Sequence, residues 1–361
     1  MLQNGYIGIK SQDLSADTTQ NSYLIFFVRY LVDKERMSTF AALEPPSLLT
    51  MLKSGVVFFI YTIMAINFEK SYTSTDDIVG ILQERGLNID NQEQAADILK
   101  NVGYYRFSAY LYPFLTQPKE NHLFKQGSRF GGAWSLYRFD KKLRIFLFNE
   151  IEKIEVALRS TIANMVSEET GNIFWMTDAA MFANEDKFRK TMALVDKELK
   201  SSKEDFIKHF KEKYSNDYPP AWMLVEILPL GVVTRIYENL ADNALRKKIA
   251  ARFSLPVPVF SSWITIITLT RNSCCHHSRV WNKENAILPM LIKKHNRAWI
   301  ATVISPNRIF YNICILKWFI DIISPQNDMK EHLKSLLACF PNVDIAAMGF
   351  PKNWEEEPLW K

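Results

Sequence analysis

The sequence predicts an all-α fold, a multi-helix bundle with accessory helices, and two observations carry that prediction. Glycine is scarce, at 12 of 361 residues, and the alternation of apolar and polar residues that marks half-buried strands is hard to find. Between about 132 and 167, apolar residues recur at steps of three and four, the spacing of one face of a long helix. With 48% hydrophobic and 23% charged residues, the chain is typical of a folded protein with a sizeable core.

The first 63 residues differ from the remainder. They show no clear helix signals before the uncharged apolar run 55–66, which is shorter than the roughly 20 residues that cross a bilayer. This run also lies too far from the N-terminus to be a signal peptide. We therefore expect a leader at 1–63, either poorly ordered or not native, followed by one helical domain at 64–361 and no membrane segment.

From Ser74 onward, caps, prolines and glycines mark the helices in order. The expected helices are 74–86, 92–102, about 132–167 (ended by Gly171), 185–200, 203–214, a pair separated by a break from Pro229 before 236–240, 245–252, the helix that carries residues 263–282, 309–323 and 329–340. The aromatic segment 104–114 could stack on bases, but core packing is favoured because aromatic side chains most often bury area. Glu155 and Arg159 lie four residues apart on the long helix, and we expect an exposed surface pair.

The stretch 271–282 concentrates two histidines, two arginines and an asparagine directly after an apolar run. On a continuous helix Asn272 and His276 share a face, Arg279 lies three residues further on the same side, and Arg271 lies at the rim. His277 points elsewhere. A fixed cation beside a group that titrates near neutral pH can cleave a phosphodiester without a metal. We predict His276 as the catalytic group, with Asn272 orienting its ring.

Other interpretations of the stretch 271–282 are open. Cys-Cys-His-His has the composition of a zinc site, but four consecutive helical residues cannot converge tetrahedrally. A cysteine nucleophile at Cys274 or Cys275 lacks an oriented base, and the histidines could also be satisfied polar groups of the core. The four cysteines show no metal-ligand spacing, so we expect no metal and no cofactor, and a reducing cytoplasm fits them.

Positive charge gathers around this stretch. Residues 244–300 contain ten basic side chains and one acidic, a charge of +9, so the rest of the chain sums to −4 against the net +5. Such a concentration is typical of a site for a polyanion such as RNA, although a solvated basic face has the same pattern. The RNA-binding candidates are His277, Arg279, Lys247 and Lys248.

Several segments, in order, resemble the Abi-like (abortive infection) family, whose members are similar to HEPN-superfamily ribonucleases. They are Arg-Asn-x-x-x-His-His-x-Arg-x-Trp-Asn at 271–282, Tyr-Tyr-Arg-Phe-Ser-Ala-Tyr at 104–110, Tyr-x-Phe-Asp-x-x-Leu-Arg at 137–144, Glu-x-x-Glu-x-x-x-Arg at 152–159, Pro-x-Trp at 220–222 and Gly-Phe-Pro-x-Asn-Trp at 349–354. The resemblance covers about 68–361. Cys275 and Pro229 depart from it, since the family favours a small residue and a serine there.

The resemblance implies a HEPN-like helical protein that cleaves RNA without a metal and acts in phage defence by stopping the infected cell. Arg271 and His276 would fill the family's Arg-x4-His motif, and one motif per chain implies a homodimer with a composite site. The products would carry a 2′,3′-cyclic phosphate, and a phage-encoded trigger or a neutralising partner would control the activity. The rival hypothesis is a non-catalytic RNA-binding or partner-binding module.

Overall fold

The computed structural model describes residues 71–292 and 296–361, and this part of the chain is helical, as the sequence predicts. It holds twelve α-helices, and extended pairing within it is limited to three isolated bridges. The helices are α4 Thr75–Glu84, α5 Gln92–Val102, α6 Tyr104–Leu111, α7 Phe130–Thr170, α8 Glu185–Ser201, α9 Asp205–Lys213, α10 Ala221–Ile227, α11 Leu230–Glu238, α12 Asn243–Arg252, α13 Val257–Cys275, α14 Ile309–Ile323 and α15 Met329–Ala338. The predicted leader, the apolar run at 55–66 and residues Lys293 and Lys294 lie outside the described residues.

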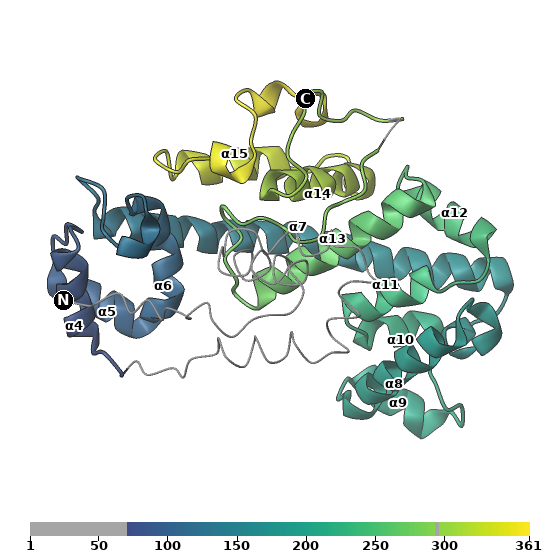
Figure 1. Cartoon of the computed structure of the whole chain (residues 1–361). Helices are drawn as coiled ribbons and strands as arrows, with labels where there is room; N and C mark the ends of the chain where they lie inside the picture. The colour runs from purple at the N-terminus through teal and green to yellow at the C-terminus, as the bar shows by residue number, and fades with distance from the viewer. Residues whose placement is uncertain (1–70, 293–295) are drawn as a thin grey trace, which may run out of the picture. The chain divides into compact units, whose positions relative to one another are not determined.

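Helix α7 is the axis of the unit Thr73–Lys361. Its 41 residues span roughly 60 Å at 1.5 Å per residue. Figure 1 shows α4, α5 and α6 near its first half, α10, α11 and α12 near its second half, and α13 and α14 beside it. The predicted apolar stripe faces these neighbours, with Leu143, Ile151 and Ile154 fully buried. The helix ends where predicted, at Gly171, whose φ of 64° suits glycine.

The predicted break after α10 is present, but the prediction that its second half begins at Ile236 was wrong. Helix α10 ends at Ile227 and α11 begins at Leu230, directly after Pro229. Proline is tolerated at a helix start, where its missing N–H leaves no bond unmade, so Pro229 opens α11. Gly231 lies inside the first turn, where a Cβ would lie 3.6 Å from the Thr268 methyl carbon of α13.

Helix α13 is a core helix until its last turns. Trp263, Ile264 and Ile267 are buried, and the helix contacts α7, α11, α12 and α14. The aromatic segment before α7 also enters the core, because Phe107 and Tyr110 are buried while Tyr105 stays exposed. Within the described residues, no single helix is long and apolar enough to cross a membrane; α12 and α13, bent by 62° at their junction, pass that test only as a pair.

The closing segment of the chain passes close to the start of α14 at Gly349, where only a residue without a side chain fits. The φ of Gly349 is +90°, and a Cβ there would lie 2.7 Å from the Arg308 Cβ. We expect Gly349→Ala to lower the free energy of unfolding by about 1–3 kcal/mol, because both the backbone and the contact become strained. Gly80→Ala is the control, since Gly80 lies inside α4 with no such neighbour within 4 Å. Its free energy of unfolding should rise by about 0.5–1 kcal/mol. Urea unfolding followed by circular dichroism measures both, and equal stability of the two variants would contradict the assignment.

Candidate functional site

The turn that follows α13, residues 276–279, is called the histidine turn here. One fully buried carboxylate, Asp140, fixes it to α7. Its Oδ1 accepts the backbone N–H groups of Val280, at 3.0 Å, and Trp281, at 2.7 Å. Its Oδ2 accepts the Tyr110 hydroxyl at 2.6 Å and the Arg144 guanidinium. Burial, and then the nearby Asp140 carboxylate, hold the pKa of the Tyr110 hydroxyl well above its ordinary value, so this donor keeps its proton. A buried charge satisfied in this way fixes the turn in place.

Three arginines add a second set of contacts to the same turn. Arg106 of α6 donates to the His277 carbonyl, and Arg144 donates to the Ser278 carbonyl at 3.4 Å. In the opposite direction, Arg279 donates to the Ala109 carbonyl at 3.4 Å. The turn is therefore held from both α6 and α7, and its position does not depend on the turn's own backbone alone.

The two histidines lie at the end of α13 and not within it. His276 is the C-cap, where its N–H donates to the Asn272 carbonyl at 2.9 Å, and His277 follows with a left-handed φ of 56°. Both side chains are exposed. The prediction that Arg279 continues the helical face of Asn272 and His276 was wrong, because the helix stops at Cys275 and the chain reverses toward Asp140.

Arg271 faces the carboxylate of Glu155 on α7. Its Nε lies 3.5 Å from Glu155 Oε2 without making a hydrogen bond, and its Nη1 donates to the Asn272 side chain at 3.5 Å. The other oxygen of Glu155 pairs with Arg159, which is buried and also donates to the Val225 carbonyl. The prediction of an exposed Glu155–Arg159 surface pair was wrong, since this carboxylate lies between two arginines in a half-buried position.

A pocket of about 850 Å³ opens beside the turn, between α7 and the last residues of α13. Its lining includes the cationic side chains Arg106, Lys141 and Arg144, the His277 ring, and one carboxylate, Glu152. His277, which was predicted to point away from the face of His276 and to be a candidate for RNA binding, lies in the lining, whereas His276 does not. Arg106, Lys141 and Glu152 were not predicted as site residues; Arg106 and Glu152 stood in segments that resemble the family, and Lys141 gave no signal.

The model of the Abi-like protein family matches residues 97–282, which is 186 of the 361 residues. The chain belongs to the Abi-like family. No curated protein and no solved structure gives a significant match. The matched range begins in α5 and ends at Asn282, so it contains Asp140 and the whole turn. Membership of this family supports a role in abortive infection.

The predicted basic window of this Abi-like chain is divided in space. Lys247 and Lys248 lie on α12, where Lys248 pairs with Glu169 near the end of α7. Glu169 lies 25 residues along α7 from Arg144, roughly 37 Å at 1.5 Å per residue. The two lysines are therefore not brought together with the histidines, and the cations beside the turn come from α6 and α7 instead.

The cysteine-nucleophile and metal-site alternatives for the stretch depend on the surroundings of its cysteines and histidines. Cys274 is buried, and burial raises the pKa of its thiol to about 12, so it is not a thiolate at neutral pH. Cys275 is half-buried in the pocket lining. Among residues 71–292 and 296–361, no group of three His, Cys, Asp or Glu side chains is placed to hold a metal ion.

The role of Asp140 can be tested by Asp140→Ala. The change leaves Arg144, Tyr110 and two backbone N–H groups without their acceptor, so we expect a loss of about 3–5 kcal/mol in the free energy of unfolding. Amide hydrogen exchange at Val280 and Trp281, which follow α13, should accelerate more than exchange within α7. Asp97→Ala, which breaks an exposed pair with Lys100, is the control and should change stability by less than about 0.5 kcal/mol. Unchanged exchange at the two amides would show that Asp140 does not hold the turn.

Proposed function

We propose that this Abi-like chain is a metal-independent endoribonuclease that acts in phage defence by stopping the infected cell. The observation that carries the proposal is the pair of exposed imidazoles, His276 and His277, on an anchored turn beside a basic pocket. Histidine changes charge near neutral pH, and guanidinium groups recognise phosphate, so this combination suits transfer within a phosphodiester.

In the proposed reaction the ribose 2′-oxygen attacks the adjacent phosphorus. His276 of one copy removes the 2′-OH proton as general base, and the bond from phosphorus to the 5′-oxygen breaks. His276 of the second copy supplies the proton that this leaving oxygen needs. The products are a 2′,3′-cyclic phosphate and a 5′-hydroxyl. Arg271, held by Glu155 and Asn272, stabilises the charge of the phosphorane.

The RNA backbone is proposed to lie along the pocket beside the turn. Arg106 and Lys141 are exposed cations in its lining, and His277 adds a third polar group. Phosphate contacts of this kind carry no sequence information and make binding strongly dependent on salt. In this role His277 binds substrate, while His276 performs the proton transfer.

The decisive variant is His276→Ala. Loss of a general acid–base group should lower the rate of RNA cleavage by about 10²–10⁴-fold, and it should remove the growth arrest that we expect from expression of the wild-type protein. The measurements are cleavage of a labelled oligoribonucleotide without added metal and colony counts after induction. His209→Ala, which alters another exposed histidine, on α9, is the matched control and should retain both activities. Full cleavage by His276→Ala would reject the proposed nuclease.

We place the second copy of the proposed homodimer on an exposed apolar face of α7. Ile145, Phe148 and Val156 share this face by helical spacing, and they are 60%, 41% and 56% exposed. Ile145 and Phe148 also line the pocket of His277, so a copy docked here would bring its turn toward the first. Apolar side chains grouped on a surface are typical of interfaces between proteins.

Phe148→Glu should therefore convert the dimer to a monomer. A buried carboxylate at an apolar interface costs several kcal/mol, so we expect dissociation at micromolar protein and a parallel loss of cleavage. Analytical ultracentrifugation measures the assembly state. Val303→Glu changes an apolar side chain that is 99% exposed in a loop, and it should leave the assembly unchanged. A dimer that survives Phe148→Glu would place the interface elsewhere.

The alternative function, a non-catalytic RNA-binding or partner-binding module, is favoured by one observation. The Arg271 guanidinium lies 3.5 Å from both Glu155 and Asn272 of its own chain, a position that also suits a structural role. The two functions differ in one outcome. If the protein is a module without catalysis, the wild-type protein and His276→Ala bind RNA equally well, and neither releases a cyclic phosphate.

A further inference from the structure

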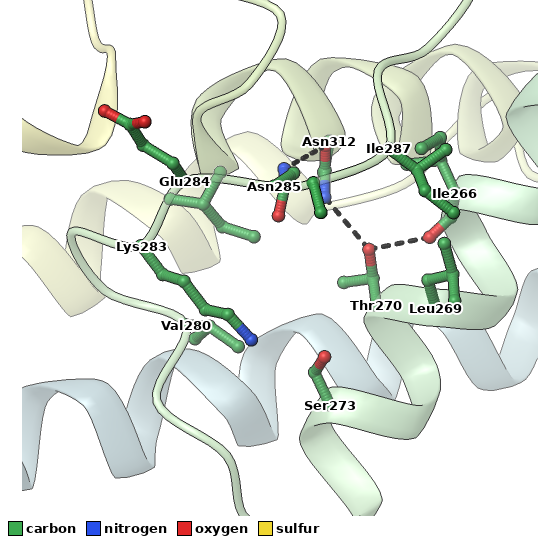
Figure 2. A pocket seen from close by; sticks show the side chains of 12 residues that line it. Ile266, Leu269, Thr270, Ser273, Val280, Lys283, Glu284, Asn285, Ile287 and Asn312 are labelled. Carbon is green, nitrogen blue, oxygen red and sulfur yellow. Dashed lines mark hydrogen bonds between the residues drawn. The ribbon is translucent and has the colours of Figure 1, made fainter. Parts of the chain in front are cut away.

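A second pocket, of about 250 Å³, lies on the other side of the last turn of α13. It is enclosed by α13, by the segment 280–287 that follows the histidine turn, and by α14 (Figure 2). Ile266, Leu269, Ile287 and Ile309 give it aliphatic walls. Two residues that line it flank the histidine turn 276–279: Ser273 lies in the last turn of α13, and Val280 directly follows the histidine turn. The pocket and the proposed catalytic turn therefore share one short stretch of chain.

A relay of side-chain hydrogen bonds fixes the orientation of the Asn285 side-chain amide in this pocket. The Thr270 hydroxyl donates to the Ile266 carbonyl at 2.8 Å, and a carbonyl can only accept. The Thr270 oxygen therefore accepts from Asn312 Nδ2, at 3.0 Å, which turns Asn312 Oδ1 toward Asn285. Asn285 Nδ2 donates to that oxygen at 3.3 Å. The relay thus ends on the side-chain oxygen Oδ1 of Asn285, which Figure 2 shows directed into the pocket.

Two further polar groups of the pocket, Lys283 and Ser273, are donors, and within the described residues their side chains have no partner. Lys283 directs its ammonium into the space beside Ser273 (Figure 2), and neither its ammonium nor the Ser273 hydroxyl makes a hydrogen bond or ion pair there. The one carboxylate of the lining, Glu284, points away and pairs with Arg308 at 2.8 Å. Asn285 thus offers a fixed acceptor, and Lys283 and Ser273 offer donors, between apolar walls. The site suits a flat ligand that has an N–H group and an anionic or acceptor group.

We propose that this pocket binds one nucleotide unit, with its base between the aliphatic walls and its phosphate at Lys283. A base presents N–H donors for Asn285 Oδ1 and acceptors for Ser273, and its faces are apolar. The ligand is either a free mononucleotide or a residue of an RNA chain. In the second case the inference rests on the proposed ribonuclease function, because a base held beside Ser273 would set which phosphodiester reaches His276.

The test begins with direct binding. AMP, GMP, CMP and UMP are titrated into the full-length wild-type protein and followed by NMR chemical shifts and by calorimetry. We expect saturable binding of at least one nucleotide, with shifts at Ser273, Asn285 and Ile287. Ser273→Leu fills the pocket and should weaken binding at least tenfold. Lys283→Gln should weaken nucleotide binding about tenfold and leave the matching nucleoside unchanged, because only the phosphate contact is removed. Lys197→Gln, an exposed lysine of α8, is the control.

The two sources of the nucleotide are separated by cleavage of oligoribonucleotides that differ at one position. If the ligand is part of RNA, Ser273→Leu changes the preferred cleavage position, while His276→Ala lowers the cleavage rate by about 10²–10⁴-fold and keeps mononucleotide binding. If it is a free nucleotide, added mononucleotide changes the cleavage rate and the preferred position stays the same. Failure of the nuclease proposal leaves mononucleotide binding in place. Absence of binding by all four nucleotides, or binding by folded Ser273→Leu and Lys283→Gln as tight as that of the wild type, overturns the inference.

Discussion

The structure around the site depends on the buried carboxylate of Asp140. A charge with no exposure is tolerated only when its oxygens are satisfied, and here four donors from three separate parts of the chain meet it. Two of these donors are backbone N–H groups directly after the histidine turn. The polypeptide must therefore leave α13 and return to α7 within a few residues, which places His276 and His277 at the surface.

The last residues of α13 lie in different environments. Arg271 faces Glu155 on α7, Ser273 lines the smaller pocket, and Cys275 lines the larger one. Because residues two apart on a helix point about 200° apart, Ser273 faces the side opposite to Arg271 and Cys275, and one helix end serves both surfaces. This explains why polar residues gather so densely in one short stretch, directly after an apolar run that must remain buried.

Local signals predicted most of the fold, and long-range contacts decided most of the site. Helix α14 has the predicted bounds, because prolines stand on both sides of its apolar run. The end of α13 was missed because the signal that stops it is Asp140, more than 130 residues earlier, and not a local Gly or Pro. The Arg271 contact with Glu155 and the hydrogen bond from Arg106 to the His277 carbonyl are also tertiary contacts, so helical spacing could not predict them.

The carboxylate of Glu155 raises the question of why an acid stands beside a group proposed to bind phosphate. One carboxylate here meets two guanidinium groups, so the local sum of charge stays positive. Arg159 makes the closer contact and is the more buried of the two, whereas Arg271 keeps a side-chain exposure of 30% and approaches at 3.5 Å without an aligned hydrogen bond. Glu155 thus restrains the direction of Arg271 more than it neutralises it. A guanidinium held in this way loses little side-chain entropy when an anion binds, which is the purpose that a preorganised cation serves.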